Sequence, residues 1–263
     1  MRIMSASICV ILLSGCASKP SFTNTALQSD ASASAVTQNW YFHATSTQYN
    51  ANFDIGGSLT FKGTSVNGIF ELTRASDATN GLCFEPGTMV TPITFQGTRS
   101  AAKLITISSV EQNQQVFNFS GPEVNTTIKG NYSLTGDCGG DLGTFSATWM
   151  QPIAGTYTGK LKNGQVLTLK LAQSASADSN GEFHLTGTRN VSTGVCGSAA
   201  TVSIANGDTD TYVVGNQFLA VFAAGGVKTI VSGTFTAGGN NLNVSSGTYG
   251  DNCQDVTNGT LIR

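Results

Sequence analysis

One eight-residue phrase occurs twice in this chain, and the repetition constrains the fold more than any other feature. VNGIFELT at residues 66–73 returns as SNGEFHLT at residues 179–186, so equivalent positions lie 113 residues apart. The cysteines recur at offsets of 113 and 115 residues, as Cys83 with Cys196 and Cys138 with Cys253. Landmarks that recur in one order indicate duplicated structural units. The sequence therefore predicts two homologous domains, at residues 38–151 and 152–263.

The repeated phrase has the pattern of a β-hairpin. It contains Asn-Gly, the dipeptide that most readily adopts positive φ at both central positions of a type I′ turn. The apolar residues after it alternate, which places them on one face of a strand. These residues are Phe70 and Leu72 in the first copy and Phe183 and Leu185 in the second. The other face changes from Glu71 to His184 between the copies, so we expect it to be exposed.

The composition favours β-structure throughout. Charged residues make up only 11% of the chain, whereas Gly is abundant at 31 residues. Short segments rich in Val, Ile, Thr and aromatic residues, separated by Gly, Asn and Asp, predict antiparallel strands. We expect an all-β protein with two tandem barrel-like domains, similar to lipocalin-type meanders in architecture only. A β-sandwich is the close alternative, and one larger sheet shared by both copies is a third.

The N-terminus has the features of an export signal. Residues 1–15 contain one basic residue, Arg2, followed by an apolar run that is far shorter than the roughly 18 residues of a membrane-spanning helix. The run ends in Leu13-Ser14-Gly15-Cys16, which resembles the lipobox of bacterial lipoproteins. The resemblance implies that the signal is cut before Cys16 and that Cys16 carries acyl chains. An ordinary secretion signal is the alternative.

The lipobox resemblance also implies a location. Ala17 follows the cysteine, and under the Gram-negative sorting rule a residue other than Asp at this position implies the outer membrane. Residues 16–37 have little apolar content and predict a lipidated, flexible tether. Without residues 1–15 the chain keeps 12 basic and 15 acidic residues, a net charge of −3. This charge gives no reason to expect nucleic acid as a partner.

Export to an oxidising compartment predicts that the four remaining cysteines form disulfides. Two pairings fit the repeat: Cys83–Cys138 with Cys196–Cys253, or Cys83–Cys196 with Cys138–Cys253. Loop-closure entropy differs too little between them to decide. Duplication favours the pairs within each copy, because a single-copy ancestor could close its own bridge. No Cys/His spacing typical of zinc sites occurs, and we expect no metal or cofactor.

Few residues suggest catalysis. The two histidines, His43 and His184, are expected on the surface, and no nucleophile elbow, HExxH motif or phosphate-binding glycine loop occurs. Aspartates flank a cysteine in each copy and could form a paired acid site or a Ca²⁺ site, although turn formation explains them better. These residues are Asp137, Asp141, Asp251 and Asp255. Asn206, Asp208 and Asp210 form a weaker, unrepeated cluster of oxygen ligands.

The sequence thus favours a membrane-anchored exported lipoprotein that acts as a non-enzymatic binding or structural module. Its partners are the membrane, through the anchor, and a protein or small molecule that the sequence does not identify. A carrier of a small apolar ligand inside the barrels is the alternative, and a carboxylate-dependent hydrolase is a weaker one. A membrane-embedded barrel fits poorly with disulfides, a lipid anchor and few aromatic girdle residues.

Tryptic mapping without reduction tests the cysteine pairing. Cleavage after Arg and Lys gives four peptides with one of these cysteines each. We expect mass spectrometry to find peptide 75–99, with Cys83, joined to peptide 130–160, with Cys138. A link from peptide 75–99 to peptide 190–228, which holds Cys196, would contradict the pairing within each copy.

Overall fold

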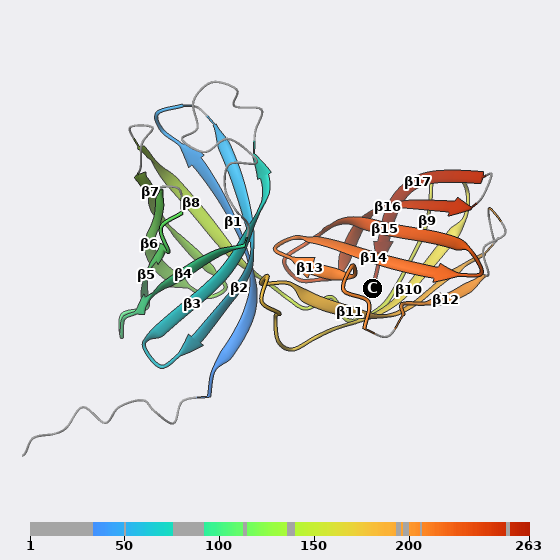
Figure 1. The fold of residues 1–263 in the computed structure, drawn as a ribbon, viewed down its shortest axis with the longest axis horizontal. Coiled ribbons are helices and arrows are strands. Elements are labelled where there is room, and N and C mark those ends of the chain that lie inside the picture. The colour runs from blue at the N-terminus through green and yellow to red at the C-terminus, as the bar shows by residue number, and fades with distance from the viewer. Residues whose placement is uncertain are drawn as a thin grey trace, which may run out of the picture.

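The computed structural model describes residues 34–49, 51–75, 92–112, 115–135, 140–192, 196, 200–205, 207–250 and 253–263. These residues form 17 β-strands in two closed antiparallel barrels, and they include no helix. Figure 1 shows the two barrels side by side. The predicted signal and most of the predicted tether lie outside the described residues.

The first barrel is an eight-stranded meander in which each strand pairs with the next. It closes where β1 pairs with β8, from Asn39 opposite Met150 to Ser46 opposite Gly143. Its strands are β1 (Val36–Ser46), β2 (Asn52–Lys62), β3 (Ser65–Ala75), β4 (Ile93–Arg99), β5 (Leu104–Ser109), β6 (Val116–Val124), β7 (Thr127–Thr135) and β8 (Asp141–Met150).

The second barrel repeats this plan with one strand position divided in two. β9 pairs with β10 and β17, β10 pairs with β11, and β13–β17 continue in sequence order, so the sheet closes. Both β12 and β13 lie along the same edge of β11. The strands are β9 (Gly155–Lys160), β10 (Val166–Gln173), β11 (Phe183–Val191), β12 (Thr201–Ser203), β13 (Tyr212–Val214), β14 (Gln217–Ala224), β15 (Val227–Phe235), β16 (Asn241–Gly250) and β17 (Cys253–Ile262).

The structure confirms two tandem antiparallel barrels and excludes the β-sandwich and the single sheet shared by both copies. β8 ends at Met150 and β9 begins at Gly155, and the predicted join between residues 151 and 152 lies between them. β1 begins at Val36, inside the predicted tether, because its pairing with β2 extends to Val36 opposite Phe61.

The buried face predicted for the repeated phrase is correct, but the predicted turn is wrong. Phe70, Phe183 and Leu185 are each at most 2% exposed, and Leu72 is partly buried and packs against the first core. In the first copy Asn67-Gly68 lies inside β3, and the turn falls at residues 63–64. Gly68 is needed there for space, because a Cβ would lie 2.6 Å from the Phe70 ring. In the second copy the pair does lie in a turn, but only Gly181 has positive φ, of 84°, so the turn is not type I′.

Aromatic side chains fill the interior of the first barrel. The Phe42 ring lies at its centre, with its centroid 5.0 Å from that of Phe70, 5.4 Å from Phe119 and 5.6 Å from Phe145. Such edge-to-face and stacked contacts add to the stabilisation from burial. Tyr132 and Phe53 continue the cluster, with centroids 5.1 Å apart.

The interior of the second barrel is mainly aliphatic. Leu167, Leu169 and Leu171 point inward at alternate positions of β10, as the period of two requires. Tyr157 is also fully buried, and its hydroxyl donates a hydrogen bond of 2.7 Å to the Gly239 carbonyl. Arg189 on β11 is only 1% exposed, and burial lowers the pKa of its guanidinium.

The two barrels are joined by a buried amide contact. The Asn39 side chain on β1 donates to the Gly215 carbonyl at 2.7 Å and accepts from the Gly215 N–H at 2.8 Å. Asn39 is 2% exposed, so both of these hydrogen bonds are shielded from water. Tyr41, also on β1, packs against the core of the second barrel. The outer face of β1 is therefore part of the junction between the barrels.

Two glycines allow the backbones of the barrels to approach closely. A Cβ on Gly56 of β2 would lie 2.7 Å from the Gly215 nitrogen, and a Cβ on Gly181 would lie 2.3 Å from the Ile69 carbonyl oxygen. Real Cβ atoms do not approach backbone atoms this closely, so any larger residue at either position would push the barrels apart.

The variant Gly56→Ala tests this close approach. We expect the added Cβ to lower the free energy of unfolding by about 1–3 kcal/mol through overpacking, measured by urea denaturation. Chemical shifts should change at Asn39 and Gly215 and stay constant in the barrel interiors. Gly238→Ala is the matched control, because its Cβ would meet only Asn240 Nδ2 at 3.4 Å. Equal stability of the two variants would contradict the prediction.

Candidate functional site

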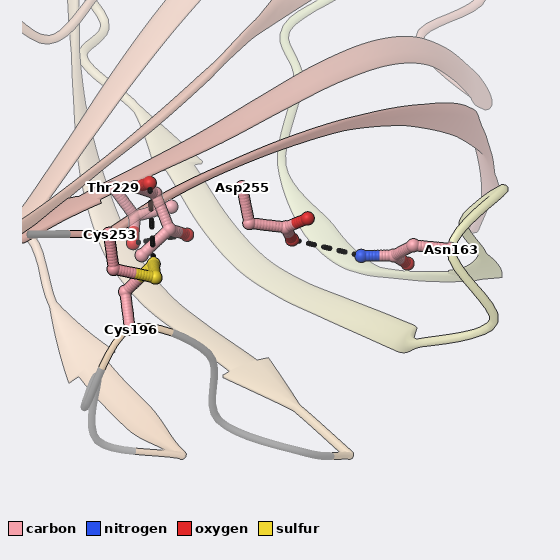
Figure 2. The surroundings of a disulfide bond; sticks show 6 residues. Asn163, Cys196, Thr229, Cys253 and Asp255 are labelled. Atoms are coloured by element: carbon pink, nitrogen blue, oxygen red, sulfur yellow. Dashed lines mark hydrogen bonds between the residues drawn. A yellow bond between two sulfur atoms is a disulfide. The ribbon is translucent and has the colours of Figure 1, made fainter.

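Cys196 and Cys253 form a disulfide in the second barrel (Figure 2), 57 residues apart in sequence. It ties the segment between β11 and β12 to the start of β17. This pairing lies within one copy, so it excludes the alternative in which both cysteines bond to the first copy. Cys83 and Cys138 lie outside the described residues, as does the predicted lipidation site Cys16.

Asp141 is a structural residue inside the first barrel. It is 1% exposed and accepts hydrogen bonds from Ser46 Oγ at 2.7 Å and Tyr132 Oη at 2.6 Å. Burial and the neighbouring carboxylate raise the pKa of the Tyr132 hydroxyl well above its ordinary value, so it stays a donor. Asp141 thus closes a buried polar network at the start of β8.

Asp255 is in a different environment, near the start of β17 and opposite Thr248 of β16. Its carboxylate accepts a hydrogen bond of 3.0 Å from Asn163 Nδ2 (Figure 2), and it is half-buried. Asp137 and Asp251 lie outside the described residues. The aspartates of the two repeats that are described therefore differ in setting, one fully buried and one partly exposed, and neither is paired with a second carboxylate.

The oxygen-rich segment near residue 208 forms a turn. Asp208 Oδ1 accepts a hydrogen bond of 2.8 Å from the Asp210 N–H, the geometry of an Asx-turn. Asn206 lies outside the described residues. In the part of the chain that is described, no three His, Cys, Asp or Glu side chains are arranged to hold a metal ion.

A groove on the outer face of the first barrel is the best candidate for a functional site. It has a volume of about 460 Å³ and lies over β1, β7 and β8. Its walls carry hydroxyl, amide, ammonium and imidazole groups. The polar lining residues are His43, Thr45, Lys129, Asn131, Thr144 and Ser146.

The groove contains a histidine oriented by a carboxylate. His43 Nδ1 lies 2.6 Å from Asp54 Oδ1, and Asp54 is 7% exposed. The two residues are direct neighbours on β1 and β2. An ionised carboxylate accepts only, so Nδ1 carries the hydrogen of this contact and Nε2 is free to face the groove. The sequence predicted a surface position for His43 but missed its partner, because the register of β1 against β2 is not encoded locally.

Two further polar residues extend this pair into a row across four strands. Ser146 on β8 is the register neighbour of His43, and Lys129 on β7 is the register neighbour of Ser146. Neighbours of this kind lie about 5 Å apart between Cβ atoms. No hydrogen bond joins Ser146 to His43, and Lys129 forms no ion pair with a described residue.

His184 lies on the second barrel, away from the groove. Its Nε2 is 3.2 Å from Asp178 Oδ2, and its side chain is 35% exposed. The prediction that His184 is partly exposed at the surface is correct. The segment that contains it also packs against the first barrel, through Gly181. Its neighbour Glu182, on the face expected to be exposed, is only 8% exposed, so that part of the prediction is wrong.

Comparisons with protein-family models, with curated proteins and with solved structures found no match. The described parts of the chain contain no helix with the length and apolar character needed to cross a bilayer. The functional argument for this protein therefore starts from its own side chains.

The variant Asp141→Ala tests the structural role of this carboxylate. It leaves the buried hydroxyls of Ser46 and Tyr132 without their acceptor, so we expect the free energy of unfolding to fall by about 2–4 kcal/mol, measured by urea denaturation. Asp255→Ala, at a partly exposed position with one hydrogen bond to an exposed residue, should change it by less than about 0.5 kcal/mol. A cost for Asp255→Ala as large as that for Asp141→Ala would contradict this assignment.

Proposed function

We propose that this protein is a lipid-anchored, non-enzymatic binding module of the outer membrane that takes its ligand on the outer surface of the barrels. The lipobox-like sequence ending at Cys16 supports the anchor. The tether of residues 16–37 would let the barrels stand away from the bilayer, since about 20 flexible residues reach roughly 25 Å.

The observation that carries the proposal is the contrast between the interior and the exterior of the first barrel. Phenylalanine rings in mutual contact occupy the interior, whereas the groove over β1, β7 and β8 offers hydrogen-bonding groups. A second outer pocket of about 310 Å³ lies over β13, β14 and β15. Ligand contact outside the barrels fits this arrangement better than an apolar ligand carried within them.

The groove favours a polar ligand with negative charge. Lys129 supplies a positive charge that no described carboxylate pairs with, and His43, Asn131 and the hydroxyls supply donors and acceptors. Asp54 is the nearby carboxylate, and it is engaged by His43. A hydroxyl-rich or carboxylate-bearing small molecule, or an acidic peptide, matches these groups.

Asp54, His43 and Ser146 follow the order of the groups in serine hydrolases, but the geometry supports binding over catalysis. A serine nucleophile needs its base within hydrogen-bonding reach, usually with preorganised donors for the oxyanion. Ser146 lies within the regular strand β8 and makes no hydrogen bond with His43. We therefore assign these residues to ligand contact.

Native mass spectrometry of the protein extracted from its host membrane tests the proposal. We expect a chain that begins at Cys16 and carries acyl chains, together with a noncovalently bound small molecule. The variant Thr144→Trp, which fills the groove at an exposed position, should lose at least about 90% of the bound species.

Thr94→Trp is the matched control, because Thr94 is exposed on β4, outside the groove. It should retain the bound species. A protein without acyl chains would overturn the anchor. The absence of a bound species from the wild type would overturn binding at the groove. Its persistence in Thr144→Trp would do the same.

A further inference from the structure

The junction between the barrels brings acidic side chains together from both copies. Gly181 packs against the backbone of Ile69 on β3, and this contact places the adjoining Glu182 beside the first barrel. Glu71 on β3 and Asp178, in the loop before β11, are close enough to act on the Glu182 carboxylate electrostatically. Three carboxyl groups thus meet where two barrels are held by buried hydrogen bonds.

Glu182 is the most confined of these groups. It is 8% exposed, and its carboxylate has no hydrogen-bond or ion-pair partner among the described residues. Its backbone does have partners: the N–H donates to Asp178 Oδ1 at 3.0 Å, and the carbonyl accepts from the Asp178 N–H at 2.9 Å. The backbone therefore fixes Glu182 in place while its charge is left uncompensated.

The surroundings of Glu182 are predominantly acidic on every packed element. β3 contributes Glu71 and the preceding loop contributes Asp178, and both act on Glu182. Tyr212 on β13 also lies near Glu182, and Asp210 acts on Tyr212. A basic group, His184, also lies in this region. Its Nε2 is 3.2 Å from Asp178 Oδ2, and it forms no ion pair with Glu182. Ionisation of Glu182 therefore adds a charge to a site that already repels it.

The protonation equilibria reflect this environment. Burial first, and then Glu71 and Asp178, raise the pKa of Glu182 from 4.5 to about 7. Burial and Asp178 also raise the pKa of Glu71. Glu71 belongs to the other barrel, so its effect and the burial at the junction are lost when the barrels separate, whereas Asp178 stays beside Glu182. Glu182 therefore binds its proton more tightly in the docked state, and docking weakens as pH rises. The change begins near pH 4.5, the ordinary value, and is complete above about pH 7.

We propose that the junction is a pH-dependent latch, which holds the two barrels rigidly together while Glu182 is protonated and loosens when Glu182 ionises against Glu71 and Asp178. The latch has its clasp at Asn39 and Gly215, and the chain passes from one barrel to the other through residues 151–154, between β8 and β9. Loosening would free the outer face of β1, which carries both the junction residues and His43 of the groove. The latch is independent of the ligand proposed above.

The clasp supplies its own reporter. The Gly215 N–H is buried and donates to Asn39 across the junction, so it can exchange with solvent only when the barrels separate. We suggest hydrogen exchange resolved to single amides by NMR, on the full lipidated chain in detergent micelles at pH 5 and pH 8. Dividing by the intrinsic rates removes the chemical pH dependence. The Val231 amide in β15, inside the second barrel, is the internal reference.

The protection of Gly215 relative to Val231 should fall between pH 5 and pH 8 by up to about 70-fold, the limit that a pKa change from 4.5 to about 7 sets. Glu182→Gln keeps a neutral side chain of the same shape at both pH values and should remove this fall. Glu111→Gln, the same change at an exposed position of the first barrel, should behave as the wild type.

Three results would overturn the latch. The first is a fall of less than about tenfold in the wild type. The second is an equal fall in Glu182→Gln, which would assign the pH dependence to another group. The third is a parallel fall of Val231, which would show unfolding of the barrel rather than separation. None of these results depends on whether the groove binds a ligand.

Discussion

Closure of each sheet by its first and last strands is the constraint on which the rest of the structure depends. β1 pairs with β8 over eight residue pairs, and β9 meets β17 at Thr158 opposite Ile262 and at Leu161 opposite Gly259. A closed barrel has no free edge, so every strand must alternate inward and outward side chains along its whole length. This alternation sets which residues can form a core, and it leaves the outward side chains, with the turns between strands, to form the contact between the described parts of the barrels.

The features that follow from period and repetition could be predicted from the sequence, and the features that follow from register could not. Alternation identified the buried side chains at Phe70 and Phe183, and the repeat identified two copies. The prediction from the Asn-Gly dipeptide put the first turn at the wrong position, because packing of the Phe70 ring over Gly68 outweighs the preference of Asn-Gly for a turn. The pairing of His43 with Asp54 depends on the alignment of two strands, which no local pattern specifies. The junction was also hidden, because it joins residues that are about 110 to 180 positions apart.

The junction explains why the outward positions of the repeated phrase differ between the copies. Ile69 of the first copy lies against Gly181 of the second, so the two phrases meet through non-equivalent residues. Tandem copies cannot present identical surfaces to each other in such a contact, and their outward residues must diverge. Ile69 corresponds to Glu182, and Glu71 to His184. The inward residues remain alike because each barrel must still fill its own core.

The division of one strand position between β12 and β13 has a consequence for how this fold can change. Both short strands lie along β11, and the chain leaves the sheet between residues 203 and 212 and then returns to the same edge. The barrel therefore already tolerates an excursion at this point without losing closure. Surface loops accept extra residues at small entropic cost. This excursion is thus a natural position at which a longer loop, a peptide epitope or a small reporter domain could be inserted while both barrels remain intact.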